Sequence, residues 1–403
     1  MKKIPGGICA AKGFTASGVH CGIRKNKTKK DLALIVSEKK ANAACVYTTN
    51  LVKGAPITVT KNNVADGYAQ AVICNSGNAN TCNANGIEIA EEMCALISNE
   101  LGISAKDIIV ASTGVIGQTL DITPIANGIP ALVKDLKAES DDAAAAIMTT
   151  DTVEKIISYS FEIGGVECKI GGIAKGSGMI HPNMATMLVF VTTDCAISSE
   201  MLQKALSEDV KDSFNMVSVD GDTSTNDMVS VMANGMAGNK EITAEGEDFD
   251  EFCKALNAVT THLCRMIAGD GEGATKLLEC IVTGANSKET AVIVSKSVIC
   301  SSLFKAAMFG ADANWGRVLC AIGYSGADVD VNKVDVAFKS VAGTVEVCKN
   351  GAGIDFSEEI AKEVLTEKEI QVLIELNDGD ATATAWGCDL TYDYVKINGD
   401  YRT

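Results

Sequence analysis

The sequence predicts a mixed α/β protein with more than one domain, and three observations support this. Short apolar runs rich in β-branched residues, typical of buried strands, alternate with longer segments whose apolar residues recur at helical spacing. The 403 residues exceed one ordinary domain, and 47% of them are hydrophobic, enough for a large core. From about residue 280, strands and helices alternate with hairpin-like spacing, which indicates a smaller α+β domain there.

The elements follow from these patterns in chain order. In the first part we expect strands at 31–38, 43–49, 56–61, 70–74 and 107–112, and helices at 87–101, 124–137 and 141–148. Strands at 158–163, 166–174 and 187–191 come next, followed by amphipathic helices at 200–215 and 249–268. A strand at 277–285 and one helix at 289–309 follow. Short strands at 334–341, 344–349 and 369–376, a helix at 357–365 and a strand-like terminal segment at 382–403 complete the chain.

Charge and cysteine usage argue against several classes of protein. The 35 basic and 52 acidic residues give a net charge of −17, which disfavours nucleic acid and anionic membranes as partners. No run of 18 apolar residues could span a membrane, and the N-terminus lacks the apolar stretch of a secretion signal. The 15 cysteines are scattered without a CxxC pair, so we expect reduced thiols, no metal site and a cytoplasmic protein.

The segment from Gly171 to Val191 is the strongest functional candidate. Glycines surround Lys175, His181-Pro182-Asn183 forms a turn, and Thr186 stands where the loop enters an apolar strand. A threonine in such a place can cut the peptide bond before it and then act as an N-terminal nucleophile. The alternative is an ordinary glycine loop before a strand, with Thr186 as a common β-forming residue.

Three further motifs have the composition of possible functional sites. The strand at 107–112 is followed by Thr113-Gly114, whose backbone N–H groups could form an oxyanion hole. A simple strand end explains these residues equally well. DGDTSTND, at 220–227, lacks the glycine and closing glutamate of a calcium loop and is better explained as a turn of self-capping side chains. GDGEGATK, at 269–276, lacks the spacing of a phosphate loop.

Several blocks together resemble one known family. AKGSGMIHPNMATML resembles the self-cleavage segment of the ornithine acetyltransferase (glutamate N-acetyltransferase) family of the cyclic arginine pathway. SGNAN, STGVIG, MTTDT, DGDTSTND, GDGEGATK, NWGR and the terminal NGDYRT are similar to further blocks of that family, in the family's order along nearly the whole chain.

The resemblance implies an N-terminal-nucleophile-like αββα sandwich, of the ornithine acetyltransferase and aminopeptidase type, plus the smaller C-terminal α+β domain. It implies a catalytic domain at 1–279, the smaller domain at 280–390 and a tail at 391–403 that returns to the active site. It also implies cleavage into two chains, with two copies of each in the assembly, and no cofactor.

The resemblance assigns the chemistry to particular residues. The chain would break between Ala185 and Thr186, and Thr186 would then carry acetyl from N-acetylornithine to glutamate in a ping-pong cycle. Thr113 and Gly114 would form the oxyanion hole. The binding set would be Thr149, Lys175, Thr186, Glu272, Asn398 and Thr403, with Glu272 suited to an ammonium and Lys175 to a carboxylate or the developing oxyanion.

Some alternatives stay open at this point. Taken without the resemblance, Glu272 and Lys175 are better explained as solvated surface charges, because most charged residues are solvated. His181 could act as a general base, although a structural role in the turn fits better. Acetyl-CoA as a second acetyl donor is decided by no motif. The two competing functions are a self-cleaving N-terminal-nucleophile aminopeptidase or amidase and a non-enzymatic α/β protein that binds an amino acid.

Overall fold

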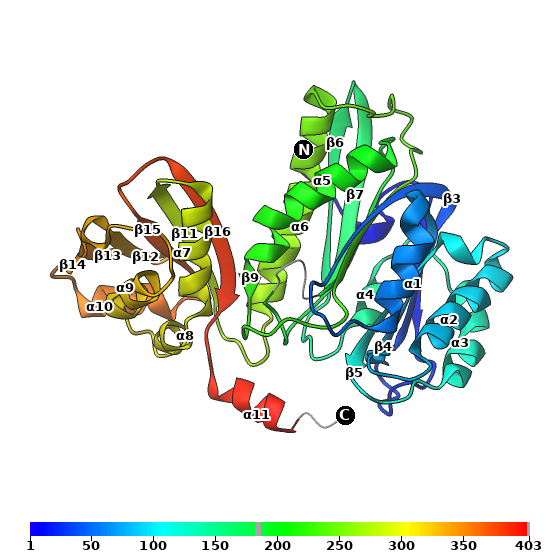
Figure 1. Ribbon diagram of the computed structural model, residues 1–403, viewed down its shortest axis with the longest axis horizontal. Coiled ribbons are helices and arrows are strands. Elements are labelled where there is room, and N and C mark those ends of the chain that lie inside the picture. Colours follow the sequence, from blue (N-terminus) through cyan, green and yellow to red (C-terminus); the bar gives the residue numbers. More distant parts are fainter. Residues whose placement is uncertain (182–186, 401–403) are drawn as a thin grey trace. The chain divides into compact units, whose positions relative to one another are not determined.

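The computed structural model describes residues 1–181 and 187–400, and these form a mixed α/β structure with two β-sheets (Figure 1). This confirms the predicted fold class, including the smaller α+β part towards the C-terminus. The chain divides into two compact units. The first contains Met1–Gly176, Pro182–Asn215 and Thr223–Leu263, and the second contains Ser177–His181, Met216–Asp222 and Cys264–Thr403. The domain boundaries predicted after residues 279 and 390 stay predictions.

The sheet of the first unit has nine strands in the described residues, in the order β1-β6-β7-β8-β10-β3-β4-β5, with β2 paired to β3. They are β1 (Lys2–Lys3), β2 (Phe14–Val19), β3 (Leu32–Tyr47), β4 (Tyr68–Asn78), β5 (Ile108–Val115), β6 (Lys155–Ile163), β7 (Val166–Lys175), β8 (Leu188–Thr193) and β10 (Met228–Ala233). The pairs β4–β5 and β8–β10 are parallel. β3 is one long strand where two were predicted, and it pairs with β2, β4 and β10.

Helices and apolar side chains cover both faces of this sheet. The helices of the unit are α1 (Ala55–Asn63), α2 (Gly86–Leu101), α3 (Ile122–Lys134), α4 (Asp141–Ile147), α5 (Ser199–Asp212) and α6 (Glu247–Gly269), the last of which continues into the second unit. Alternate residues of β4 belong to different cores: Val72 packs in the core that includes α4, and Ile73 packs in the core that includes α2 and α3. α2 confirms the predicted helix and ends at Gly102, whose φ of 69° suits a helix C-terminus.

The strand predicted at 56–61 is wrong, because this segment forms α1. Pro56 stands at the start of the helix, where its missing N–H costs nothing. The hydroxyl of Thr60 donates to the carbonyl oxygen of Val110 at 2.7 Å and accepts from the N–H of Val110 at 2.8 Å. These bonds and burial of the Ile57 side chain against the sheet outweigh the weak strand preference of β-branched residues.

The second unit has a seven-stranded sheet within the described residues, in the order β14-β13-β12-β15-β11-β16-β9. Its strands are β9 (Val217–Ser218), β11 (Leu277–Ala285), β12 (Asp335–Ser340), β13 (Gly343–Lys349), β14 (Ala352–Gly353), β15 (Glu369–Glu375) and β16 (Ala381–Cys388). Its further helices are α7 (Lys288–Cys300), α8 (Ser302–Phe309), α9 (Trp315–Gly323), α10 (Glu358–Thr366) and α11 (Tyr392–Asp400). α7 packs on β11 and β16, towards the β9 edge of the sheet (Figure 1).

Two predictions for this unit need correction. The single helix predicted at 289–309 is two helices, α7 and α8, bent by 58°. Ser301 separates them, since its side chain accepts the N–H of Phe304 and thereby caps α8. The terminal segment 382–403 is strand-like only as far as Cys388, after which α11 forms. The Asp389 carboxylate ends the strand by accepting hydrogen bonds from the N–H groups of Thr275 (2.8 Å) and Lys276 (2.9 Å).

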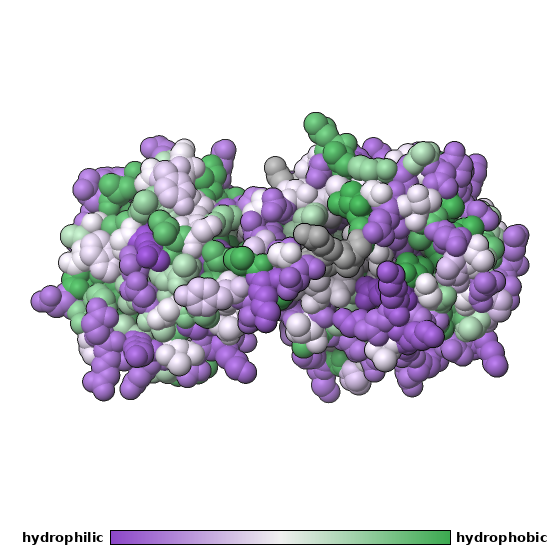
Figure 2. All heavy atoms as spheres, turned by 90° about the horizontal axis from the view of Figure 1, so that it is seen from below, coloured by the Kyte–Doolittle hydropathy of each residue, from purple (hydrophilic) through white to green (hydrophobic). Residues whose placement is uncertain are grey.

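The described helices and surface agree with the composition. No single described helix is long and apolar enough to cross a membrane, and only the bent pair α7–α8 passes that test by length and composition. On the face drawn in Figure 2, hydrophilic side chains surround scattered apolar ones. All 15 cysteines lie in the described residues and are free thiols, most of them buried.

Candidate active site

The predicted cleavage site, Ala185–Thr186, lies outside the described residues, so the site is described through its neighbours. Met187 follows it in the sequence and is buried, and its carbonyl oxygen accepts the N–H of Met228 at 2.9 Å. In the sheet, Leu188 pairs with Lys175 of β7 on one side and with Met228 of β10 on the other. The strand that begins just after the predicted nucleophile is therefore held between a lysine and the end of the DGDTSTND segment.

Thr113 and Gly114 lie near the end of β5, where the ladder to β4 becomes irregular. Asn78 of β4 pairs with both Thr113 and Val115. Gly114 has a φ of 129°, and a Cβ atom there would clash with the backbone of Gly77, so only glycine fits. Such an irregularity releases backbone groups from regular pairing and re-aims them. An oxyanion hole needs backbone N–H groups that are free of regular pairing, so this strand end is compatible with the predicted one.

Asn226 holds this strand end in place, and the sequence did not reveal it. Its side-chain nitrogen donates to the carbonyl oxygens of Ala79 (2.5 Å) and Ser112 (3.0 Å), while its oxygen accepts the Thr81 hydroxyl (2.5 Å). The carbonyl of Ser112 and the N–H of Thr113 belong to one planar peptide group. Asn226 therefore orients the peptide that enters the predicted oxyanion hole.

Asp151 of the MTTDT block links Thr149 to the end of β7, where Lys175 lies. Its buried carboxylate accepts hydrogen bonds from the N–H of Thr149 (2.9 Å), the N–H of Gly176 (2.7 Å) and the Lys155 ammonium (2.8 Å). Burial alone would raise the pKa of Asp151, but the positive charges of Lys155 and Lys175 outweigh it and lower that pKa. The ionised carboxylate thus fixes Thr149 and the end of β7 at one place.

A second buried aspartate, Asp227, has a pKa shifted in the opposite direction. Asp227 lies just before β10, and burial raises its pKa well above the usual range, against the opposing effects of Ser224 and Lys175. Among the described residues no group hydrogen-bonds its Oδ2 atom. Lys175 itself is only 8% exposed, so its reading as a solvated surface charge is wrong.

Arg24 connects these groups and was also missed, because it begins a basic run at 24–30 that has the appearance of a solvated loop. Its guanidinium donates to the carbonyl oxygen of Met148, the residue before Thr149. Its side chain occupies the space beside Gly77, the strand partner of Gly114. The charges of Lys175 and Arg24 both oppose the burial that raises the pKa of Cys74 to about 12.

The second unit brings two further predicted residues together. The side-chain nitrogen of Asn398, in α11, donates to the Glu272 carboxylate at 2.7 Å. The N–H of Glu272 donates to the carbonyl oxygen of Ser177 at 3.0 Å, and a Cβ atom on Gly178 would clash with the Glu272 carboxylate. The glycine-rich segment is therefore packed directly on Glu272. Thr403, predicted to bind substrate, lies outside the described residues.

His181 is held within the second unit by its own neighbours. Its Nδ1 atom lies 3.2 Å from the Ser218 hydroxyl and 3.5 Å from the Cys300 sulfur. Burial and the charge of Lys296 lower its pKa, so the imidazole is neutral near pH 7. In the described part of the chain, no three or more His, Cys, Asp or Glu side chains lie together as a metal site would require.

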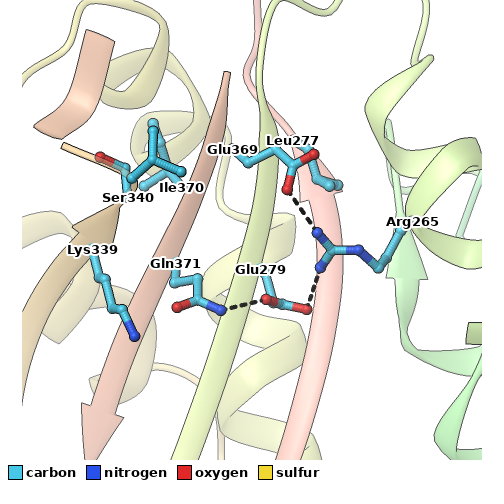
Figure 3. Close-up of a pocket in the computed structure, with 9 residues that line it drawn as sticks. Arg265, Leu277, Glu279, Lys339, Ser340, Glu369, Ile370 and Gln371 are labelled. Atoms are coloured by element: carbon cyan, nitrogen blue, oxygen red, sulfur yellow. Dashed lines mark hydrogen bonds and ion pairs between the residues drawn. The ribbon is translucent and has the colours of Figure 1, made fainter. Parts of the chain in front are cut away.

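A pocket of about 340 Å³ in the second unit contains none of the predicted site residues (Figure 3). Arg265 pairs with Glu279 at 2.6 Å and with Glu369 at 2.8 Å (Figure 3). Gln371 and Trp386 also donate to Glu279, at 2.7 and 2.8 Å. These donors outweigh burial and lower the pKa of Glu279. Arg265, Glu279 and Glu369 are thus paired with one another, which suits a structural network better than a substrate site.

Comparison with known proteins places the chain in a family. The sequence model of the ArgJ family matches residues 15–403. The arginine biosynthesis bifunctional protein ArgJ of Caldanaerobacter subterraneus subsp. tengcongensis is 51% identical over the whole of both chains. The protein of the same name from Bacillus subtilis is 49% identical, over all of this chain and 98% of its own. The crystal structure of ArgJ from Bacillus halodurans, 49% identical with a TM-score of 0.51, covers 54% of this chain and all of its own.

The fold, the site and these relatives define the protein as an acyltransferase, an enzyme of acetyl transfer in arginine biosynthesis. This favours acetyl transfer over both the aminopeptidase and the binding-protein alternatives. The chain belongs to the ArgJ family.

Proposed function

We propose that this enzyme cuts its own chain at Ala185–Thr186 and then transfers acetyl from N2-acetylornithine to glutamate through an ester on Thr186. The main support is the pairing of Leu188 with Lys175. The strand that follows Thr186 in sequence therefore begins beside Lys175, in the unit whose sheet contains Thr113-Gly114. The B. halodurans chain supports the cleavage, since it aligns over its full length with 54% of this chain. Residues 186–403, the second fragment after the proposed cleavage, would make up the same fraction of this chain.

Self-cleavage needs only the chain and one water molecule. The Thr186 hydroxyl oxygen attacks the carbonyl carbon of Ala185, the peptide bond breaks, and the Thr186 nitrogen takes the hydroxyl proton. Water then hydrolyses the resulting ester, which frees the Ala185 carboxylate and restores the Thr186 hydroxyl. The products are residues 1–185 and residues 186–403, the second with a new α-amino group.

The new amine can serve as the base for acetyl transfer. An α-amino group has a pKa of about 7.7–8.0 in model peptides, so a useful fraction is unprotonated near neutral pH. It takes the proton of the Thr186 hydroxyl, whose oxygen attacks the acetyl carbonyl of N-acetylornithine, and ornithine leaves with the proton. The amine of glutamate then attacks the ester and carries acetyl away. In both halves Thr113 and Gly114 stabilise the tetrahedral oxyanion.

Charge selects the substrates. The Glu272 carboxylate, held by Asn398, suits the side-chain ammonium of ornithine. Lys175 suits the α-carboxylate or the developing oxyanion, and its burial strengthens either contact. Thr149, held by Asp151, and Thr403 complete the proposed binding set.

Acetyl-CoA is proposed as a second donor to glutamate, because the ArgJ proteins of C. subterraneus and B. subtilis are called bifunctional. The test is formation of N-acetylglutamate from acetyl-CoA and glutamate without N-acetylornithine. We also propose an assembly of two copies of each cleaved chain in the cytoplasm, with no resident cofactor.

Intact mass of the denatured protein tests the core of the proposal. We expect two fragments that meet at Ala185–Thr186 in the wild type and one uncut chain in Thr186→Ala. Thr186→Ser retains a hydroxyl and should still cleave, more slowly. A wild-type chain that stays uncut would refute the mechanism. Fragments that hydrolyse N-acetylornithine without acetylating glutamate would favour the aminopeptidase or amidase alternative.

A further inference from the structure

The residues just before the proposed cleavage site are tied to the second unit by Asp220. We call Ser177–His181 the upstream segment. The carboxylate of Asp220 accepts the N–H of Met179 at 2.6 Å and the N–H of Ile180 at 2.8 Å, one on each oxygen. Two consecutive N–H groups on one carboxylate are charge-assisted bonds, stronger than bonds between neutral groups. Among the contacts of the upstream segment, these two bonds fix the backbone at Met179 and Ile180.

This contact holds a backbone conformation that the segment would otherwise avoid. Met179 has a φ of 56°, in the left-handed region that is unfavourable for a residue with a Cβ atom. Gly178 beside it cannot carry a side chain, because a Cβ atom would meet Glu272. Without a partner such a glycine-rich stretch would sample many conformations. The two bonds to Asp220 select one of them.

Asp220 is itself held firmly. The N–H of Val219 donates to the carbonyl oxygen of Ile180 at 2.7 Å, so the two segments pair like short strands. The Val219 carbonyl in turn accepts the ammonium of Lys305, whose side chain is buried. Asp220 also accepts the N–H of Asp222 at 3.3 Å, which confirms the predicted self-capping turn.

We infer that Asp220 is a positioning residue for self-cleavage, which holds the upstream segment that leads in sequence to the proposed cleavage site. The inference rests on the proposed self-cleavage. An attack within one chain is fast only when the reacting groups are already placed, and loose placement loses that advantage. Ile180 lies five residues before Ala185, close enough in sequence to restrict the bond that breaks. Because Asp220 is not in the proposed binding set, we expect acetyl transfer by the cleaved enzyme to depend little on it.

The test is the rate of cleavage of the full chain, followed by intact mass after a pulse of cell-free synthesis. Asp220→Asn is isosteric, but it can accept only one of the two N–H groups and faces the other with its own donor. We expect its cleavage half-time to lengthen about ten- to hundredfold. Asp222→Asn removes the same charge from an exposed position in the same turn and should cleave like the wild type.

Two further readouts separate positioning from general stability. The unfolding temperature of Asp220→Asn should match that of Asp222→Asn, and acetyl transfer per cleaved molecule should stay within about twofold of the wild type. Asp220→Glu retains the charge but moves the oxygens, so we expect intermediate slowing; it replaces Asp220→Asn if that variant does not fold.

Cleavage of Asp220→Asn at the wild-type rate would overturn the inference while self-cleavage itself stands. Slower cleavage together with a large fall in unfolding temperature would also overturn it, since the residue would then act through stability alone. A wild-type chain that never cleaves would refute the proposed function, and the inference with it.

Discussion

Replacing Asp151 by asparagine should test whether one buried carboxylate organises the first unit's part of the site. The side chains of Asp151 and Lys155 are both fully buried and 2.8 Å apart. Asparagine would leave the Lys155 ammonium without its counter-charge and would turn an amide donor towards the N–H groups of Thr149 or Gly176. Breaking one partner of a buried pair costs about 3–5 kcal/mol. For a unit of this size that corresponds to a fall of roughly 6–20 °C in the unfolding temperature.

The assay is thermal unfolding followed by circular dichroism from pH 8 to pH 3. Folding lowers the pKa of Asp151, so its stabilisation is present above the usual aspartate pKa of about 3.9 and is lost as the pH falls through the folded value. The gap between wild type and Asp151→Asn should therefore be constant from pH 8 to pH 5 and shrink below about pH 4. Adding Lys155→Met should recover part of the loss, whereas Glu251→Gln, in an exposed ion pair, should change little. An Asp151→Asn variant that melts within about 2 °C of wild type would refute the reasoning.

Three further outcomes follow from the site. Gly114→Ala should lower kcat/KM for acetyl transfer by about a hundredfold or more, because the new Cβ atom displaces the strand end; a change within twofold would remove Gly114 from the oxyanion hole. Arg24→Met should lower kcat/KM about tenfold through loss of its bond to the Met148 carbonyl, and an unchanged value would make that contact incidental. The rate of acetyl transfer should rise with pH through about 7.7–8.0, where the Thr186 amine loses its proton, and a profile flat from pH 6 to pH 9 would exclude the amine as base.

Local patterns made much of the fold predictable. The strands β4 and β5 are apolar runs buried on both faces, and α2 has apolar residues on one side and a glycine at its end. The segment of α1 was predicted as a strand because its alternating β-branched residues have the strand period. Its hydrogen bonds with Val110, which the local sequence does not reveal, stabilise the helix. A short segment does not contain the information that its tertiary partner supplies.

The candidate site was predictable where a motif carried it and not where distant residues meet. Lys175, Thr113 and Gly114 were named from resembling blocks, but Arg24 reaches Met148 across 124 positions of sequence. Asn226 likewise acts on Ser112 from 114 positions away. Such contacts depend on the tertiary arrangement of the sheet, so local spacing and composition do not predict them.

The helix α1 also bears on how this protein avoids joining other chains. β5 ends the strand order of the first sheet, and an edge strand offers its backbone groups to any extended chain that approaches. Thr60 occupies both the N–H and the carbonyl of Val110 with one hydroxyl, so the helix lies where an intruding strand would have to pair. The buried Thr60 therefore protects this part of the sheet edge from pairing with another chain, in addition to its packing role.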